Sequence, residues 1–274
     1  SCIIQEKIIG YNKRLYLIND KYFCFKINTD FLDYREKNRN VKIIQRVGDV
    51  GTHGKPELTN LVRATVIHSD FLIFPSVWAK DYIEYSGKNF AIIKNRPLKC
   101  FHVNKKKYKK PKHALKVVTH HWSTNPKKGF NVYSELVEIL RKEKIEIEFT
   151  YIGRYYKSYQ PSATKIIEPT HGIELGDKLR EHDIYITASR FEPCGMHHVE
   201  GSASGLPVIF HKDGGGINEL CKNHGESFEN FDEFLVALEK IKSNMSAYKE
   251  KINYEYLSLT RCIDSYISVI ENLK

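Results

Sequence analysis

Two glutamates, Glu192 and Glu200, lie eight positions apart in the segment of this sequence that is best suited to chemistry. An apolar run at 184–188 has the length of a buried strand, so Glu192 falls in the loop that follows it. After Pro193-Cys194-Gly195 the chain can begin a helix whose first amides lack intrahelical partners. Glu200 follows about two helical turns later. Carboxylate oxygens that accept hydrogen bonds are thus placed beside amides that can bind an anion.

A glycine turn follows the same helix and a second strand. Gly205-Leu206-Pro207 ends the helix, because glycine suits the position after a helix and proline cannot continue one. The apolar run 208–210 is the next buried strand, and Gly214-Gly215-Gly216 lets backbone amides approach an anion closely. We expect the two carboxylates and the two helix starts to meet at the carboxyl ends of adjacent parallel strands, where open α/β sheets bind ligands.

A lysine stands at a third strand-to-helix turn. The sequence HHWSTNPKKG lies between an apolar strand at 115–119 and an amphipathic helix at 131–142. Lys128 and Gly129 enter that helix, where a point charge and free amides can hold a phosphate group. A solvated surface lysine is the alternative interpretation of Lys128, because exposed lysines are common in such a chain.

These motifs resemble the donor-sugar site of retaining glycosyltransferases of family 4. The resemblance rests on Glu-x7-Glu at Glu192 and Glu200, on GLPVI after it, and on the GGG-x-x-E that ends at Glu219. The string FEPCG is also similar to the matching loop of glycogen and starch synthases. Taken alone, two glutamates at this spacing more often lie on a solvated helix; the flanking strands and the triple glycine favour the resemblance. It implies an α/β protein of the GT-B fold, two Rossmann-like domains facing each other across a cleft, with the N-terminal one truncated.

The resemblance assigns roles to individual residues. It places Lys128 on the diphosphate, Glu200 on two vicinal ribose hydroxyls, and Glu192 on the sugar side, where a carboxylate stabilises positive charge at the anomeric carbon. It also implies amide contacts to the sugar or the phosphates from Gly195, Met196, Gly215 and Gly216. His171 and Gly172, which follow a strand, are candidates for a contact with the nucleobase, and a simple turn is an equal alternative there.

The sequence departs from this family at two places. The family has an arginine after the first strand of the second domain, where this chain has His120-His121-Trp122. The phosphate contact could instead come from one of four residues: Arg154, Arg190, Arg46 or Lys127. A first-domain histidine that contacts the donor sugar in the family also lacks a counterpart, and Arg46 and Asp49 are the catalytic candidates at the corresponding strand end. His197 and His198 begin a helix beside the site and could simply pack there.

Alternating strands and helices predict two α/β domains, at 1–111 and 112–274. In the first, segments 14–18 and 22–27 predict a β-hairpin, and strands are expected at 41–47, 71–74 and 90–93, with helices at 60–67 and 76–85. In the second, strands are expected at 115–119, 147–152, 165–168, 184–188 and 208–210. The run KKKYKKPK at 105–112 is interpreted as a solvated linker, with a membrane or phosphate contact as the alternative. The resemblance implies that the last helix packs back on the first domain.

Composition bounds the class of protein and its partners. The net charge of +10 favours anionic partners, such as a nucleoside diphosphate or the surface of an anionic membrane. Lysines are spread along the chain, which argues against a nucleic-acid-binding module. The sequence contains neither an apolar run long enough to span a membrane nor a secretory leader, so we expect a cytoplasmic protein in contact with a membrane at most peripherally. The six cysteines form no C-x-x-C pair, which is typical of reduced thiols.

The resemblance implies a specific reaction. A hexose would pass from a nucleoside diphosphate sugar, with UDP or GDP as carrier, to a glycan, lipid or protein acceptor with retention of configuration. No cofactor and no metal is expected, because the Asp-x-Asp pair that commonly holds a metal at the leaving diphosphate does not occur in the sequence. A metal site built from Asp49 and His53 is the alternative. The other functions that remain open are a degenerate GT-B domain that binds without turnover, and a glucan-synthase-like enzyme or a sugar epimerase on the same fold.

Overall fold

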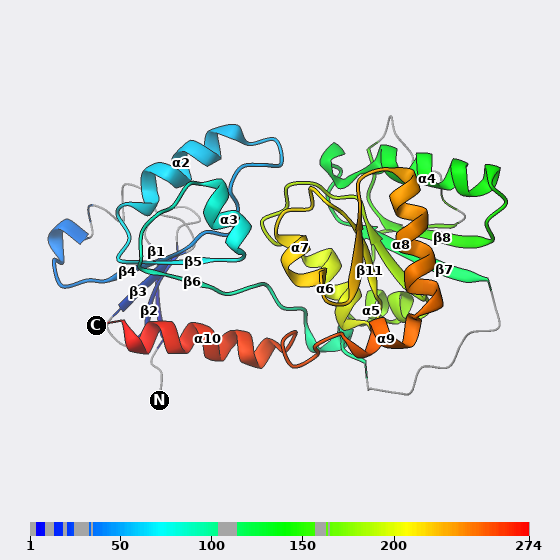
Figure 1. The fold of residues 1–274 in the computed structure, drawn as a ribbon. Helices are drawn as coiled ribbons and strands as arrows, with labels where there is room; N and C mark the ends of the chain where they lie inside the picture. Colours follow the sequence, from blue (N-terminus) through cyan, green and yellow to red (C-terminus); the bar gives the residue numbers. More distant parts are fainter. Residues whose placement is uncertain are drawn as a thin grey trace. The chain divides into compact units, whose positions relative to one another are not determined.

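The computed structural model divides the chain into two compact units (Figure 1). Unit 1 comprises Ser1–Lys94 and Thr260–Lys274, and unit 2 comprises Asn95–Leu259. The structure describes residues 33, 35–103, 114–156, 163 and 165–273, and the backbone alone of 4–8, 14–18 and 21–24. The charge run at 105–112 lies outside the described residues.

The division differs from the boundary at 111/112 that the sequence suggests. Residues 95–103 belong to unit 2 because Phe101, in the 3-10 helix η1 (Lys99–Phe101), is buried in one core with Leu175 and Leu179. The last helix, α10 (Leu259–Asn272), belongs to unit 1, where Ile270 is buried with the strand residue Ile44. The second crossing of the chain between units therefore comes at the start of α10, between Leu259 and Thr260.

Unit 1 is built on a six-stranded sheet in the order β1-β2-β3-β4-β5-β6. Its first three strands are antiparallel and the last three run parallel to β3. The predicted hairpin forms as β2 and β3. The bounds are β1 (Ile4–Ile8), β2 (Arg14–Ile18), β3 (Lys21–Cys24), β4 (Ile43–Arg46), β5 (Phe71–Phe74) and β6 (Phe90–Ile92).

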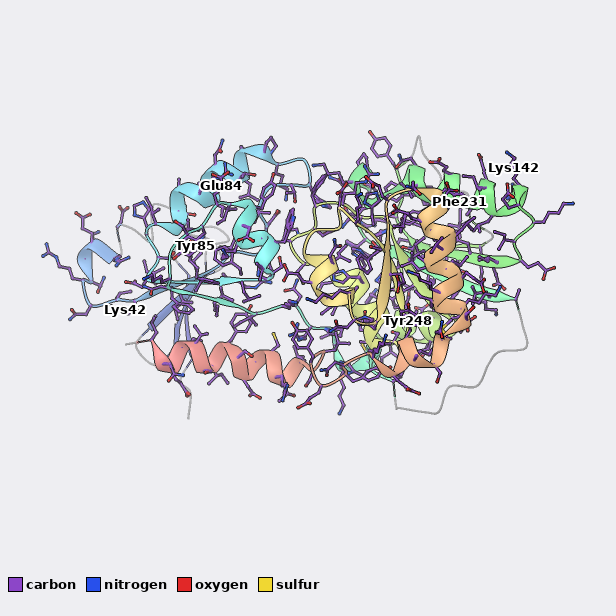
Figure 2. The ribbon with its side chains drawn as sticks, in the orientation of Figure 1. Lys42, Glu84, Tyr85, Lys142, Phe231 and Tyr248 are labelled. Carbon is purple, nitrogen blue, oxygen red and sulfur yellow. The ribbon has the colours of Figure 1, made fainter. Side chains whose placement is uncertain are left out.

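Two helices complete unit 1. Helix α2 (Pro56–Val66) begins four residues before the predicted start, because Pro56 has the fixed φ that suits a first helical position. Helix α3 (Val77–Tyr82) is capped by Ser76, whose side chain accepts a hydrogen bond from the Ala79 N–H at 3.0 Å. Tyr85, labelled in Figure 2, follows α3, and its ring centre lies 5.6 Å from that of Phe74 on β5.

Unit 2 contains a parallel six-stranded sheet in the order β12-β11-β10-β7-β8-β9. The strands are β7 (Leu115–His121), β8 (Ile147–Gly153), β9 (Lys165–Ile167), β10 (Ile184–Thr187), β11 (Val208–His211) and β12 (Gly225–Phe228). The helices are η2 (Pro126–Lys128), α4 (Phe130–Lys142), α5 (Gly172–Arg180), α6 (Met196–Ala203), α7 (Gly216–Cys221), α8 (Phe231–Ser243) and α9 (Met245–Glu250). The predicted α/β class with a parallel sheet is confirmed.

Successive residues of the central strands pack into different cores. Val117 of β7 lies in one core with residues of α4 and α8, whereas Val118 lies in a second core with residues of α5, α6 and α7. The same alternation separates Ile184 from Tyr185 on β10. Side chains of a strand point to opposite faces in turn, so helices cover both faces of this sheet.

The strand order places a topological switch between β7 and β10. From β7 the chain first extends the sheet on one side through β8 and β9, and later on the other through β10, β11 and β12. The loops after β7 and β10 therefore leave the carboxyl edge of the sheet side by side, in the position where open α/β sheets bind ligands.

Candidate functional site

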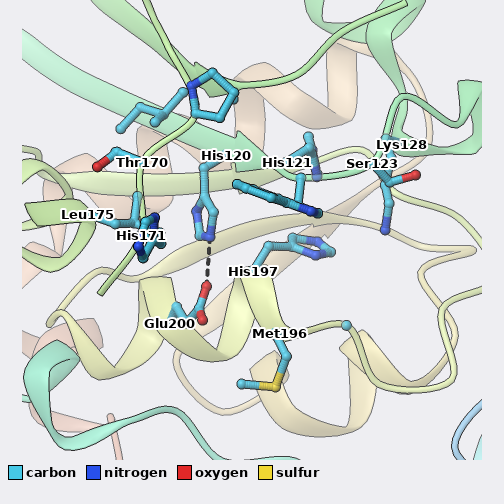
Figure 3. Close-up of a pocket in the computed structure, with 15 residues that line it drawn as sticks. His120, His121, Ser123, Lys128, Thr170, His171, Leu175, Met196, His197 and Glu200 are labelled. Atoms are coloured by element: carbon cyan, nitrogen blue, oxygen red, sulfur yellow. Dashed lines mark hydrogen bonds and ion pairs between the residues drawn. The ribbon is translucent and has the colours of Figure 1, made fainter. Parts of the chain in front are cut away.

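A pocket of about 340 Å³ opens at this carboxyl edge, within unit 2 (Figure 3). Its walls come from the end of β7, the turn before α4, the segment before α5 and the first turns of α6. Five of the predicted contacts line it: Lys128, His171, Gly195, Met196 and Glu200. Four others that belong to unit 2 are not among its lining residues: Glu192, Gly172, Gly215 and Gly216.

Lys128 reaches the site from a tight turn. The Asn125 side chain accepts a hydrogen bond from the Lys127 N–H at 2.9 Å and so caps η2. Gly129, with φ of +86°, ends it, and a Cβ there would lie 2.5 Å from the Ala188 Cβ. The lysine ammonium group forms an ion pair with the Glu192 carboxylate, and the two side chains are only 12% and 8% exposed. The structure therefore joins the two residues that the sequence assigned to the diphosphate and to the sugar.

The Glu192 loop is hydrogen-bonded to the glycine turn. The Gly216 N–H donates to the Glu192 carbonyl at 2.8 Å, and the Glu192 N–H donates to the Gly214 carbonyl at 3.2 Å. Gly215 lies between these contacts at φ of +73°, a conformation that a side chain would strain. The glycines thus hold the backbone of Glu192, a role the sequence did not predict, and the Gly216 amide is already engaged.

Glu200 lies on α6 and meets a histidine on β7 (Figure 3). Its Oε2 is 2.8 Å from His120 Nε2, and the other ring nitrogen, Nδ1, is 3.1 Å from the Tyr185 hydroxyl. The Glu200 side chain is 18% exposed and that of His120 is 9% exposed. A carboxylate is therefore held at the pocket wall by a buried pair of polar side chains.

Two further histidines lie deep in the same wall. His121 Nε2 is 2.8 Å from the Tyr133 hydroxyl, and His197 Nε2 is 2.9 Å from Thr187 Oγ1. Burial lowers the pKa of His197 well below its usual value, with His121 and Lys128 adding to the effect, so this ring is neutral at pH 7. Burial raises the pKa of Tyr133 to about 12. The sequence placed His197 beside the site but gave no role to His121 or Tyr133; the paired histidines at the end of one strand and the start of one helix were the available signal.

Trp122 and Arg154 form a stacked pair at the pocket. Trp122 lines the pocket with 59% of its surface exposed, and the Arg154 guanidinium lies 4.3 Å from its ring centre. The Arg154 N–H donates to the His121 carbonyl at 2.9 Å, which connects the loop after β8 to the end of β7. Arg154, one of the four cations that could replace the family's arginine, thus lies beside a residue of the pocket. Two of the others, Lys127 and Arg190, line a separate cavity of about 560 Å³.

The remaining predicted residues lie in other segments. His171 precedes α5 as its N-cap residue, and Gly172 follows at φ of +61°. Arg46 ends β4 in unit 1, where its Nε donates to the Tyr266 hydroxyl at 2.9 Å. Asp49 accepts a hydrogen bond from the Gly51 N–H at 3.0 Å. Arg46 and Asp49 therefore have contacts within unit 1, and their catalytic roles stay predictions.

The part of the chain that the structure describes contains neither a cluster of metal ligands nor a membrane-spanning helix. Within residues 35–103, 114–156 and 165–273, no three side chains of His, Cys, Asp or Glu are grouped so that they could hold a metal ion. None of the helices that the structure describes is long and apolar enough to cross a bilayer.

The sequence of unit 2 is similar to known glycosyltransferases. Residues 116–249 match the family model described as "Glycosyl transferases group 1". A probable sucrose-phosphate synthase of Thermosipho melanesiensis is 28% identical over 169 residues, which are 59% of this chain and 39% of that protein. The chain thus spans well under half the length of this curated relative.

Solved structures show the fold. The complex of HepE of Anabaena with UDP has a TM-score of 0.69 at 13% identity, covering 88% of this chain and 75% of that one. The galactosyltransferase WaaB of the lipopolysaccharide outer core, in its apo form, has 0.67 at 14%, with 92% and 75% covered. A mutant of S. aureus TarM in complex with fondaparinux, alpha-GlcNAc-glycerol and UDP has 0.61 at 13%, with 97% and 64% covered. The predicted GT-B fold class is thereby confirmed.

Proposed function

We propose that this chain is a glycosyltransferase that moves a hexose from a nucleoside diphosphate sugar to an acceptor with retention of configuration. One observation carries the proposal: two carboxylates lie at the carboxyl edge of one parallel sheet, each held by a residue far away in the sequence. Glu200 contacts His120, which is 80 positions away, and Glu192 contacts Lys128, which is 64 positions away. The match to glycosyltransferases group 1 covers this region.

The donor fits the pocket by charge and by hydrogen-bonding capacity. Glu200 offers acceptor oxygens for the two hydroxyls of a ribose, and Lys128 offers a cation for the diphosphate. Trp122, which lines the same pocket as His171, gives an exposed aromatic face on which a nucleobase can stack. HepE structures contain UDP and UDP-glucose, which makes a uridine nucleotide the first donor to test.

The reaction uses the Lys128–Glu192 ion pair in two ways. A bound diphosphate competes with Glu192 for the lysine ammonium group, which releases the carboxylate toward the sugar. As the bond from the anomeric carbon to the diphosphate oxygen breaks, Lys128 stabilises the leaving oxygens and Glu192 stabilises positive charge at the anomeric carbon. The acceptor oxygen forms the new glycosidic bond on the face that the diphosphate leaves, and its proton passes to the departing phosphate.

We further propose that transfer needs no metal. The cationic Lys128 and the partial positive charge at the start of the 13-residue helix α4 can stabilise charge on the leaving group. The acceptor is a glycan, lipid or protein, and an anionic membrane surface is a peripheral partner suited to the net charge of +10.

Binding of nucleotides tests the proposal first. Thermal unfolding is measured with UDP-, GDP- and ADP-sugars, since a ligand at 100 times its Kd stabilises the folded chain by about 2.7 kcal/mol. A shift with at least one nucleotide sugar is expected, and no shift with any of them contradicts the proposal. Product NMR with the donor that binds then shows the anomeric configuration. Binding without turnover would identify the degenerate binding domain, and extension of an α-glucan primer would identify the glucan-synthase-like enzyme.

A further inference from the structure

We propose that His120, held by Tyr185, is a positioning residue that fixes the Glu200 carboxylate for ribose and makes the pocket selective for ribonucleotides. The inference rests on the proposed function, in which Glu200 binds the ribose. It adds two residues, His120 on β7 and Tyr185 on β10, that act on the ribose through Glu200.

Backbone and side-chain contacts fix the His120 ring between two neighbouring strands. The Tyr185 hydroxyl accepts the backbone N–H of His120 at 3.2 Å and lies 3.1 Å from the ring Nδ1. It is also 3.3 Å from the His120 carbonyl. Tyr185 is fully buried, and β10 pairs directly with β7, so neither ring can turn away without disturbing the sheet.

The hydrogen-bond partners of the His120 ring determine which of its nitrogens donates to Glu200. Burial raises the pKa of Tyr185 well above its usual value, so its hydroxyl keeps its proton. When that proton is donated to Nδ1, the neutral ring carries its own proton on Nε2 and donates it to Glu200. A carboxylate only accepts hydrogen bonds, so the 2.8 Å contact with Glu200 Oε2 agrees with a proton on Nε2. Nε2–H therefore points at the carboxylate.

Helix α6 can bring Glu200 to this ring because the next residue is a glycine. A Cβ at Gly201 would lie 2.6 Å from the Tyr185 ring, so only glycine allows this close approach of helix to strand. The Glu200 carboxylate then keeps one oxygen on His120 while the residue lines the pocket, and an ionised carboxylate has about four lone-pair sites for further donors. A carboxylate held in advance loses little freedom when the ribose binds.

The experiment compares UDP with 2′-deoxy-UDP by calorimetry on the full chain. The wild type is expected to bind UDP roughly tenfold or more tightly, because one hydrogen bond to a charged group is lost in the deoxy compound. His120→Ala should weaken UDP binding more than 2′-deoxy-UDP binding, which keeps only the 3′-hydroxyl for Glu200, so that the preference falls toward unity. Tyr185→Phe, which keeps the ring and loses the hydroxyl, should reduce the preference in part. Tyr248→Phe, a matched loss of a tyrosine hydroxyl on α9, should keep it.

A second measurement does not depend on any variant folding. In ¹⁵N-histidine NMR of the wild type, the His120 Nε2 signal should show a protonated nitrogen and should shift with UDP more than with 2′-deoxy-UDP. Failure of the wild type to bind any nucleotide would defeat the proposed function itself. Nucleotide binding with a ribose preference that survives both His120→Ala and Tyr185→Phe, or an unprotonated Nε2, would overturn the positioning role alone.

Discussion

The buried ion pair of Lys128 and Glu192 affects two properties that can be measured separately. One is nucleotide binding and the other is the free energy of unfolding. Each side chain is more than four-fifths buried, so neither charge is well solvated without its partner. Removing one partner of such a pair leaves an uncompensated charge, whereas removing both leaves none.

The binding consequence is that Lys128→Ala should weaken UDP far more than uridine, because the lost cation faces the diphosphate and not the base. A charge-assisted bond contributes about 1.5–3 kcal/mol, which is roughly a tenfold to hundredfold change in Kd. Calorimetric titration of both compounds measures it. Equal losses for the two compounds would point to damaged folding and would remove Lys128 from the diphosphate.

The stability consequence appears in a double-mutant cycle. Lys128→Met alone should lower the free energy of unfolding by about 3 kcal/mol, because Glu192 keeps its charge in a buried place. Adding Glu192→Met should restore much of the loss, since both charges are then gone. Urea unfolding of the two single variants and the double variant gives the coupling free energy. Additive effects would show that the pair is not coupled in the folded chain.

At the scale of elements, β7 and α6 decide which side chains meet. The strand continues through His120 and His121, and alternate residues face opposite cores. His120 therefore meets α6, and His121 meets Tyr133 on α4. A buried histidine also joins α6 to the start of β12: His224 Nε2 is 2.8 Å from Ser202 Oγ, and Ser202 donates to the His198 carbonyl.

This contact predicts a pH dependence of stability. Burial lowers the pKa of His224 to about 4, against 6.5 for the ordinary side chain. Above pH 6.5 the ring is neutral in both states. Between pH 6.5 and 4 the His224 ring is protonated in the unfolded chain but still neutral in the folded chain. The free energy of unfolding therefore falls as the pH falls, by up to about 3 kcal/mol.

The variant His224→Gln isolates that effect, because glutamine can donate to Ser202 and does not titrate. Urea unfolding at pH 7, 6, 5 and 4.5 should show a smaller acid loss in His224→Gln than in the wild type. Exposed His68, which lies in unit 1, provides the matched control: His68→Gln should keep the acid loss of the wild type. Parallel curves for the wild type and His224→Gln would mean that the buried ring is not the source.

The whole chain has a net charge of +10, and Lys127 and Lys128 lie directly before α4. Positive charge of this kind can stabilise the leaving diphosphate. The sequence lacks an Asp-x-Asp pair, and the pocket is lined by the cationic side chain of Lys128.

Donor turnover should therefore persist in excess chelator. Turnover is measured with the nucleotide sugar that binds, before and after re-addition of magnesium or manganese. Activity that disappears with chelator and returns with metal would overturn the metal-free mechanism, and with it the main reason to place the leaving-group charge on Lys128.

The amino-acid sequence alone is enough to predict the α/β class, most of the strands and helices, and the segments that carry Lys128, Glu192 and Glu200. These depend on local signals: apolar runs of strand length, a 3.6-residue stripe, glycine and proline at helix ends. The sequence pattern does not predict strand β12, because Gly225–Phe228 contains no apolar run. It also predicts the end of β7 at residue 119 and not at His121, because the two final histidines are polar.

Contacts between distant residues become visible only in the folded chain. His120 and Glu200 are 80 positions apart, Lys128 and Glu192 are 64 apart, and Tyr185 joins the first pair from a third segment. These contacts follow from β10 lying beside β7 and from α6 packing on Tyr185 through Gly201. Strand order and helix approach are set by the burial of both faces of the sheet, which involves the whole unit at once, so no local pattern contains them.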